Sequence, residues 1–139
     1  LFNLGASEFV SLFHDGRLQA DASLPSGIRT PLGADMEPGF DSVLSAQTMF
    51  PVLSGDEMAG HYSENDVAQA VRQGLLTGEN GAWAILSKRV ESIAEYRAAF
   101  DQVIGADTPL HFSDISNAIA AFIAFDIGLR TILSFWNGF

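Results

Sequence analysis

Residues 113–125, Ser-Asp-Ile-Ser-Asn-Ala-Ile-Ala-Ala-Phe-Ile-Ala-Phe, carry the clearest helical pattern of this chain. Ser113 is the expected N-cap of this helix, with Ser116 at the third position rather than glutamate. The apolar side chains recur at the spacing of one helix face, which would consist of Ile115, Ala118, Ile119, Phe122 and Ile123. The pattern predicts a helix that packs through a wide apolar face.

Shorter helical patterns precede this one. Asp41 and Ser42 are cap candidates for a short helix that carries Gln47 and ends at Pro51. Residues 63–66 can cap a helix over residues 67–76 that stops near Gly78, Asn80 can cap a helix through Val90, and helical spacing continues over 93–104. No strand alternation of useful length appears. The sequence therefore predicts a mostly α, irregular helical domain with long loops.

Residues 21–40 are rich in proline and glycine and lack apolar periodicity, which predicts a long irregular loop. The chain has 139 residues and is 47% apolar, a size and composition that suit one globular domain. We expect a single domain or a fragment of a longer protein. Residues 1–62 would form a loop-rich part, and residues 63–139 would form a helical part.

Charge and cysteine content exclude several classes of function. The net charge is −10 and only seven residues are Lys or Arg, so no basic stripe exists to meet phosphates and nucleic acid is not an expected partner. Asp126 and Arg130 interrupt the apolar C-terminal stretch, which argues against a transmembrane span. The chain has no cysteine, which excludes disulfides, thiolate metal sites and the Cys-x-x-Cys-His motif that attaches c-type haem.

Three spaced elements could carry chemistry: Phe13-His14-Asp15-Gly16-Arg17, then Gln47, then Glu57-Met58. Glu57 follows an apolar helix end, where we expect partial burial, and a carboxylate in that position could shuttle protons. A lone glutamate is more often a solvated loop acid. Gln47 could hold a substrate or water, because an amide both donates and accepts hydrogen bonds. Asp15-Gly16 predicts a turn, with Arg17 available to pair with a carboxylate.

The order and spacing of these elements resemble the segment between the two haem-attachment motifs of dihaem cytochrome c peroxidases and their MauG-like relatives. That segment carries Phe-Trp-Asp-Gly-Arg, a glutamine, and ten residues later a glutamate followed by methionine. Residues 96–100 and 115–122 also resemble two helices of the family. The resemblance implies a cytochrome c-like helical domain in which residues 1–62 contribute to the distal pocket of the peroxidatic haem.

Within that family, Gln47 and Glu57 match the pair that lines the peroxidatic haem pocket, so the resemblance implies that they are catalytic. His14, Arg17 and Met58 are the candidate cofactor-binding residues. His14 replaces the tryptophan of the family motif. It could ligate a metal or bond a haem propionate, or it could be a surface histidine in a turn. Met58 is expected to pack in the core rather than to ligate haem. His61 and His111 are expected to be surface or capping residues, and we assign no protein metal ligands.

The resemblance also implies cofactors and partners. Two haem c groups would be attached to flanking polypeptide, and calcium is a further family cofactor. The expected activity is reduction of hydrogen peroxide or oxidation of a partner protein, with a redox partner such as a small electron-donor cytochrome and a periplasmic location. The alternative is a non-catalytic helical docking or assembly subunit without redox chemistry.

Overall fold

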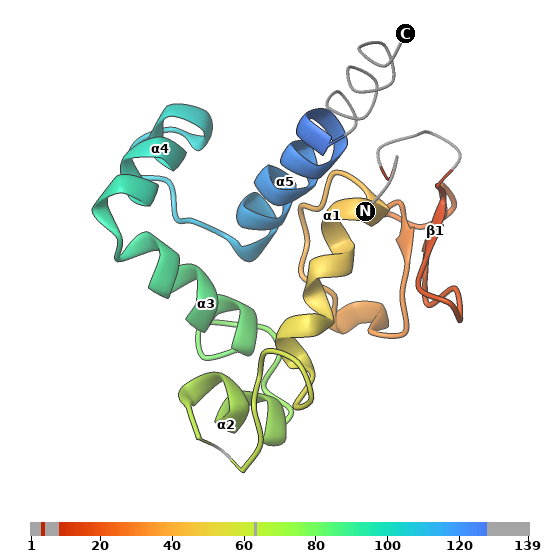
Figure 1. Ribbon diagram of the computed structural model, residues 1–139, viewed down its shortest axis with the longest axis horizontal. Helices are drawn as coiled ribbons and strands as arrows, with labels where there is room; N and C mark the ends of the chain where they lie inside the picture. Colours follow the sequence, from red (N-terminus) through yellow and green to blue (C-terminus); the bar gives the residue numbers. More distant parts are fainter. Residues whose placement is uncertain (1–3, 5–8, 63, 128–139) are drawn as a thin grey trace, which may run out of the picture.

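The computed structural model describes residues 4, 9–62 and 64–127, and within them the fold is mostly helical (Figure 1). The mostly α prediction is confirmed. The helices are α1 (Val43–Ala46), α2 (Asp66–Arg72), α3 (Ala82–Glu91), α4 (Ala94–Ile104) and α5 (Phe112–Phe122), with the short helical turns η1 (Gly33–Asp35), η2 (Gln47–Met49), η3 (Pro51–Leu53) and η4 (Ile123–Ile127). None of the described helices is long and apolar enough to cross a membrane.

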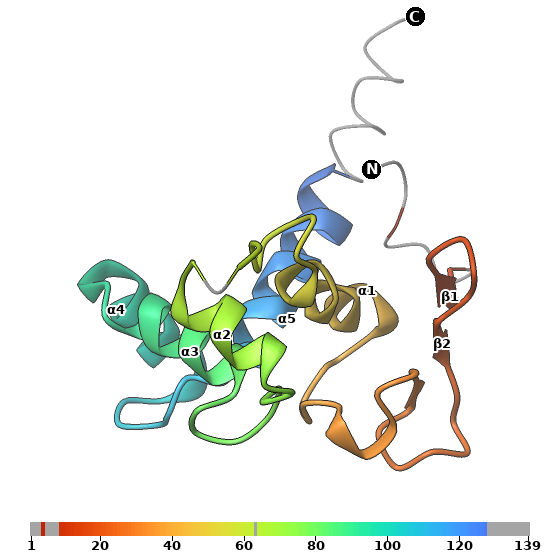
Figure 2. The same ribbon diagram turned by 90° about the horizontal axis from the view of Figure 1, so that it is seen from below.

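A small antiparallel sheet, which the sequence did not predict, lies at one end of the molecule. Its strands are β1 (Ser11–Leu12), β2 (Leu18–Ala20) and β3 (Ile28–Arg29), in the order β1-β2-β3. Figures 1 and 2 show the sheet at the side of α1 that faces away from α3 and α4. With only two or three residues each, the strands are too short to give a recognisable alternation of apolar and polar residues.

The main core forms where α1, α3, α5 and the sheet meet. Trp83 of α3 is fully buried, as are Leu18 of β2 and Met49 of η2. The indole Nε1–H of Trp83 donates to the carbonyl oxygen of Met49 at 3.3 Å, and its ring stacks on Phe112 with centroids 6.4 Å apart. These contacts join α3 to both the η2 segment and the start of α5. A second, smaller core lies under α2, around Val67, Ala70 and Ala82.

Helix α5 begins one residue before the predicted N-cap, so the expectation for Ser113 is wrong. The N-cap is His111, whose backbone N–H donates to the Asp114 carboxylate at 2.9 Å. The expectation that His111 is a surface or capping residue is confirmed. The carboxylate of the third residue after the cap accepts from a backbone N–H that would otherwise lack a partner.

The predicted apolar face of α5 is also wrong. Ile119 and Phe122 are 43% and 59% exposed. The buried side of the helix consists instead of Phe112, Ser113, Ser116 and Ala120. Ser116 donates to the carbonyl of Phe112 at 2.9 Å, and its hydroxyl lies 2.6 Å from that of Thr48. Small side chains on this side let α5 approach α1 closely, and the buried hydroxyl of Ser116 keeps hydrogen-bond partners, so the larger apolar side chains remain outside.

Several other boundaries differ from expectation. Ser42 caps α1 as predicted, but the α-helix ends after one turn and continues as η2 and η3. Asn65 caps α2 through a 3.0 Å bond from the N–H of Ala68, although the helix ends at Arg72, well before Gly78. Asn80 does not cap α3, whose N-cap is Gly81 without a side-chain bond.

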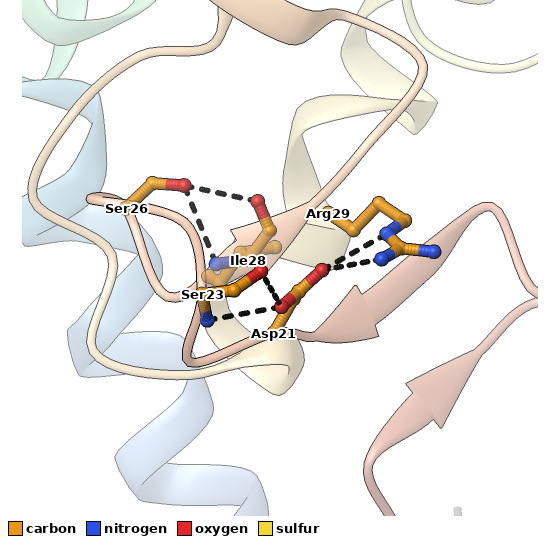
Figure 3. Close-up of polar contacts among 5 residues, drawn as sticks. All are labelled: Asp21, Ser23, Ser26, Ile28 and Arg29. Carbon is orange, nitrogen blue, oxygen red and sulfur yellow. Dashed lines mark hydrogen bonds and ion pairs between the residues drawn. The ribbon is translucent and has the colours of Figure 1, made fainter.

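The predicted irregular loop over residues 21–40 contains β3 and η1, and Asp21 is the centre of a group of hydrogen bonds within it (Figure 3). Its carboxylate accepts from the hydroxyl of Ser23 at 2.6 Å and from Nη2 of Arg29 at 2.6 Å. The hydroxyl of Ser26 stabilises the same turn by donating to the carbonyl of Ile28 at 2.9 Å. Hydrogen bonds from Ser23, assisted by Arg29, lower the pKa of Asp21 to about 2.

This group of hydrogen bonds predicts an acid-sensitive loop. A carboxylate with a lowered pKa stabilises the folded loop above its ordinary pKa of 3.8 and loses that contribution as the pH falls through about 2. We expect the amide resonance of Ser23 and the Arg29 Nε–H resonance to shift together between about pH 4 and pH 2. In Asp21→Asn the transition should disappear. The same transition in that variant would show that another group controls the loop.

Candidate functional site

An apolar groove lies between α3, α5 and the segment that contains η2 and η3. Its cavity volume is about 420 Å³, within the range of small-molecule sites. One wall comes from residues 47–58 and the other from α3 and α5. The lining residues are Gln47, Thr48, Pro51, Val52, Met58, Leu86, Arg89, Val90, Phe112, Ile115 and Ile119. Side chains of α5 that were expected in the core therefore line this groove.

Two of the predicted site residues meet in the groove. Gln47 is the first residue of η2, directly after α1, and its side chain is half-buried. Met58 is 64% exposed, so the expectation that it packs in the core is wrong. Its backbone N–H donates to the carbonyl of Pro51 at 3.1 Å, which folds the chain back onto η3. This return of the chain brings Met58 to the same wall as Gln47.

Glu57 is exposed, so the expected partial burial is wrong. It lies in a turn held by bonds to the carbonyl of Ser54, which accepts from the N–H of Glu57 at 3.2 Å and of Ala59 at 3.0 Å. Glu57 does not line the groove, but it is the sequence neighbour of Met58, which does. Its negative charge also acts on Arg17, since it helps to raise the pKa of that guanidinium, behind the larger effect of Asp15.

The residues from Phe13 to Arg17 form the predicted turn. The N–H of Gly16 donates to the carbonyl of Phe13 at 3.1 Å, and both residues have positive φ angles, 64° and 66°. Arg17 pairs with Asp15 at 2.8 Å, and hydrogen bonds from Arg17 lower the pKa of Asp15 to about 2. The expectation that Arg17 pairs with a carboxylate is thus confirmed, and the carboxylate is that of Asp15 in the same turn.

This turn is attached to the segment between Gln47 and Glu57 by aromatic contacts. The ring of Phe13 meets Phe50 edge-on with centroids 5.3 Å apart. The Arg17 guanidinium lies 5.3 Å from the Phe13 ring and 5.8 Å from the Phe50 ring. Sequence reasoning assigned no contact to Phe50, which lies between η2 and η3. These contacts join the turn over residues 13–17 to Phe50, although the long loop over residues 21–40 separates them in the sequence.

His14 is exposed, and in the described ranges it makes no hydrogen bond or ion pair. The other two histidines pair with carboxylates, His61 with Asp56 at 3.1 Å and His111 with Glu37 at 3.9 Å. Among residues 4, 9–62 and 64–127, no group of three or more His, Cys, Asp or Glu side chains could hold a metal ion.

A larger cavity of about 550 Å³ lies between the sheet, α1 and α5, and none of the predicted site residues lines it. Its walls include Val10, Ile28, Phe40, Val43 and Ala120. The predicted site is therefore associated with the smaller groove, where an amide and an arginine side chain adjoin apolar walls.

Comparison with known proteins decides the family. The sequence model described as di-haem cytochrome c peroxidase matches residues 1–128. The chain belongs to the di-haem cytochrome c peroxidase family. The match includes every residue that the structure describes, so the groove and the turn over residues 13–17 are both features of a family member. Neither the curated proteins nor the solved structures contain a match.

Membership of the di-haem cytochrome c peroxidase family supports a peroxidase-type haem function at the level of the family, with haem c as the implied cofactor. The residues of this chain fit one part of such a site. The apolar walls of the groove suit the face of a porphyrin, and Gln47 offers a polar group beside it. The residues of this chain cannot attach haem covalently, because the chain has no cysteine.

Proposed function

We propose that this chain supplies the distal wall of the peroxidatic haem pocket in a dihaem c-type peroxidase. The observation that carries this proposal is the groove in which Gln47 and Met58 meet the apolar side chains of α3 and α5. Both haems would be attached to flanking polypeptide, and the complete protein would be periplasmic. When bound, haem iron supplies the electron transfer that reduction of hydrogen peroxide requires.

Gln47 orients the substrate in this proposal. Its amide can donate a hydrogen bond to one oxygen of a peroxide while accepting one from the other. The position of Gln47 is fixed, because η2 follows directly from the buried helix α1 and is anchored by the fully buried Met49. A glutamine held at the wall of the groove would keep its amide in place to orient the substrate.

Glu57 carries the proton in this proposal. Cleavage of the O–O bond requires a proton to move from one peroxide oxygen to the other, which a carboxylate can accept and return. The exposure of Glu57 gives this carboxylate access to protons from solvent. The positive charge of Arg17 attracts the Glu57 charge, and the turn that carries Arg17 is attached to Phe50.

His14, Arg17 and Met58 are proposed to contact the cofactor or its surroundings. Met58 would pack against the porphyrin face, as its exposed position in the groove wall allows. The polar ring of His14 could bond a propionate, and its exposure leaves it accessible for such a contact. The oxidised target would be a small electron-donor cytochrome or another protein partner.

The gene that encodes the complete protein provides the first test of this proposal. One Cys-x-x-Cys-His motif on each side of this segment, together with hydrogen peroxide reduction by the purified protein, is the expected result. A complete protein with no haem-attachment motif would contradict the proposal and favour a docking or assembly subunit. The exposed apolar side chains of α5 would then serve a protein contact instead.

A second expected result concerns the polypeptide itself. Because residues 1–139 contain no thiol, this segment should carry no thioether-linked haem after proteolysis of the complete protein. The measurement is the intact mass of the peptides from this segment, with the flanking haem peptides as a positive control. A mass excess equal to haem on any of them would contradict the attachment of both haems to flanking polypeptide.

A further inference from the structure

Arg89 is the one charged side chain among the described residues that line the apolar groove. It lies in the last turn of α3, next to Val90, which also lines the groove. The Arg89 side chain is 51% exposed, so its guanidinium lies at the rim where the groove meets solvent. An arginine in this position places a guanidinium at one edge of a largely apolar site.

The orientation of this guanidinium is fixed from a neighbouring helix. Nη2 of Arg89 pairs with Oδ1 of Asp66, the first residue of α2. The same oxygen accepts the backbone N–H of Val67 at 3.0 Å, which fixes the Asp66 carboxylate in turn. Within the described ranges, Nε and Nη1 of Arg89 have no hydrogen-bond partner. The guanidinium therefore keeps donors for a second anion.

The groove and its rim together match a particular ligand shape. Apolar walls with a single cation at the edge suit a flat apolar molecule that carries carboxylates on one side, which is the shape of haem with its two propionates. A guanidinium binds a carboxylate through two parallel hydrogen bonds. We propose that Arg89 binds a propionate of the peroxidatic haem and that Asp66 positions Arg89 for this contact, an inference that rests on the proposed function of the groove.

The test uses the complete haem-bearing protein and measures the haem directly. Arg89→Leu should shift the propionate bending mode in the resonance Raman spectrum. It should also lower the reduction potential of the peroxidatic haem, because a nearby cation favours the reduced, more negative state. The expected change in the reduction equilibrium is on the order of tenfold, the scale of one hydrogen bond to a charged group.

Two further variants separate geometry from charge. Arg89→Lys keeps the charge but not the paired donors, so the Raman mode should shift while the potential changes little. Lys88→Leu is the matched control, since it removes the same charge one residue away. The Nζ of Lys88 instead donates to the carbonyl of Glu79 at 2.8 Å, outside the groove. Lys88→Leu should therefore leave both measurements unchanged.

The outcomes distinguish this inference from the proposed function. Gln47→Leu should change ligand binding at the peroxidatic haem if that haem occupies the groove. An effect of Gln47→Leu without any effect of Arg89→Leu would overturn the propionate contact alone. No effect of either variant would overturn the proposed function as well.

Equal changes in Lys88→Leu and Arg89→Leu would show a general charge effect and would also overturn the contact. If Arg89→Leu does not fold, Asp66→Asn must shift the Raman mode.

Discussion

The variant Glu57→Gln should lower peroxidase turnover of the complete haem-bearing protein by about 10²–10⁴-fold, the scale of general acid–base catalysis. Glutamine preserves the size of the side chain and part of its hydrogen bonding, but it cannot accept and return a proton near neutral pH. The thermal midpoint should change little, because the side chain is exposed and contributes little to the core. Gln47→Ala should cost less turnover, since it removes orientation and not proton transfer.

Asp56→Asn is the matched control for that experiment. Asp56 is the neighbouring carboxylate, its side chain is 91% exposed, and it pairs with His61 at 3.1 Å rather than with any residue of the groove. It should keep wild-type turnover. Near-wild-type turnover in Glu57→Gln, with both haems present, would remove Glu57 from the mechanism. Equal losses of turnover in the two variants would show that the negative charge of the turn matters, rather than proton transfer by Glu57.

The largest effect on stability is expected from Trp83→Ala. Removing a large, fully buried ring from a core typically costs about 3–5 kcal/mol in the free energy of unfolding. Trp83 is 0% exposed, and its loss would also leave the carbonyl of Met49 without the indole donor. Urea denaturation monitored by far-UV circular dichroism measures the change. Because Trp83 joins α3 to η2 and α5, the groove should be lost together with the core.

Tyr96→Ala provides the comparison for Trp83→Ala. Tyr96 is an aromatic residue on the next helix, α4, and it is 55% exposed. Its removal should change the free energy of unfolding by no more than about 0.5 kcal/mol, as is usual for surface substitutions. A loss of more than that from Tyr96→Ala, or less than about 1 kcal/mol from Trp83→Ala, would contradict the assignment of Trp83 as the centre of the core.

Much of the helical architecture could be predicted from the sequence, because the caps and the apolar spacing are local signals. Ser42 and Asn65 cap their helices as expected. The face through which α5 packs could not be predicted, because hydrophobicity favours the side with Ile119 and Phe122. The helix instead buries Ser113 and Ser116, and the hydroxyl of Ser116 has partners in Thr48 and in the helix backbone. The tertiary structure determines which hydrogen-bond partners, such as Thr48, lie beside the helix.

The same distinction applies to the candidate site. The resemblance implied that Gln47 and Glu57 line one pocket, but Met58 and not Glu57 joins Gln47 in the groove wall. The opposite wall from α3 and α5 could not be expected from the sequence. Arg89 had no motif that singled it out, and only its contact with Asp66 shows where its charge is held. Glu57 was expected to be partly buried because apolar residues precede it, but the chain turns at Ser54 and directs this carboxylate to the surface.

A crystal structure of the complete haem-bearing protein tests the central claim most directly. The groove proposal predicts a haem in contact with Met58, Ile115 and Ile119, with the amide of Gln47 on the open side of the iron. Clear electron density for both haems at other places, with the groove filled by protein side chains, would contradict it.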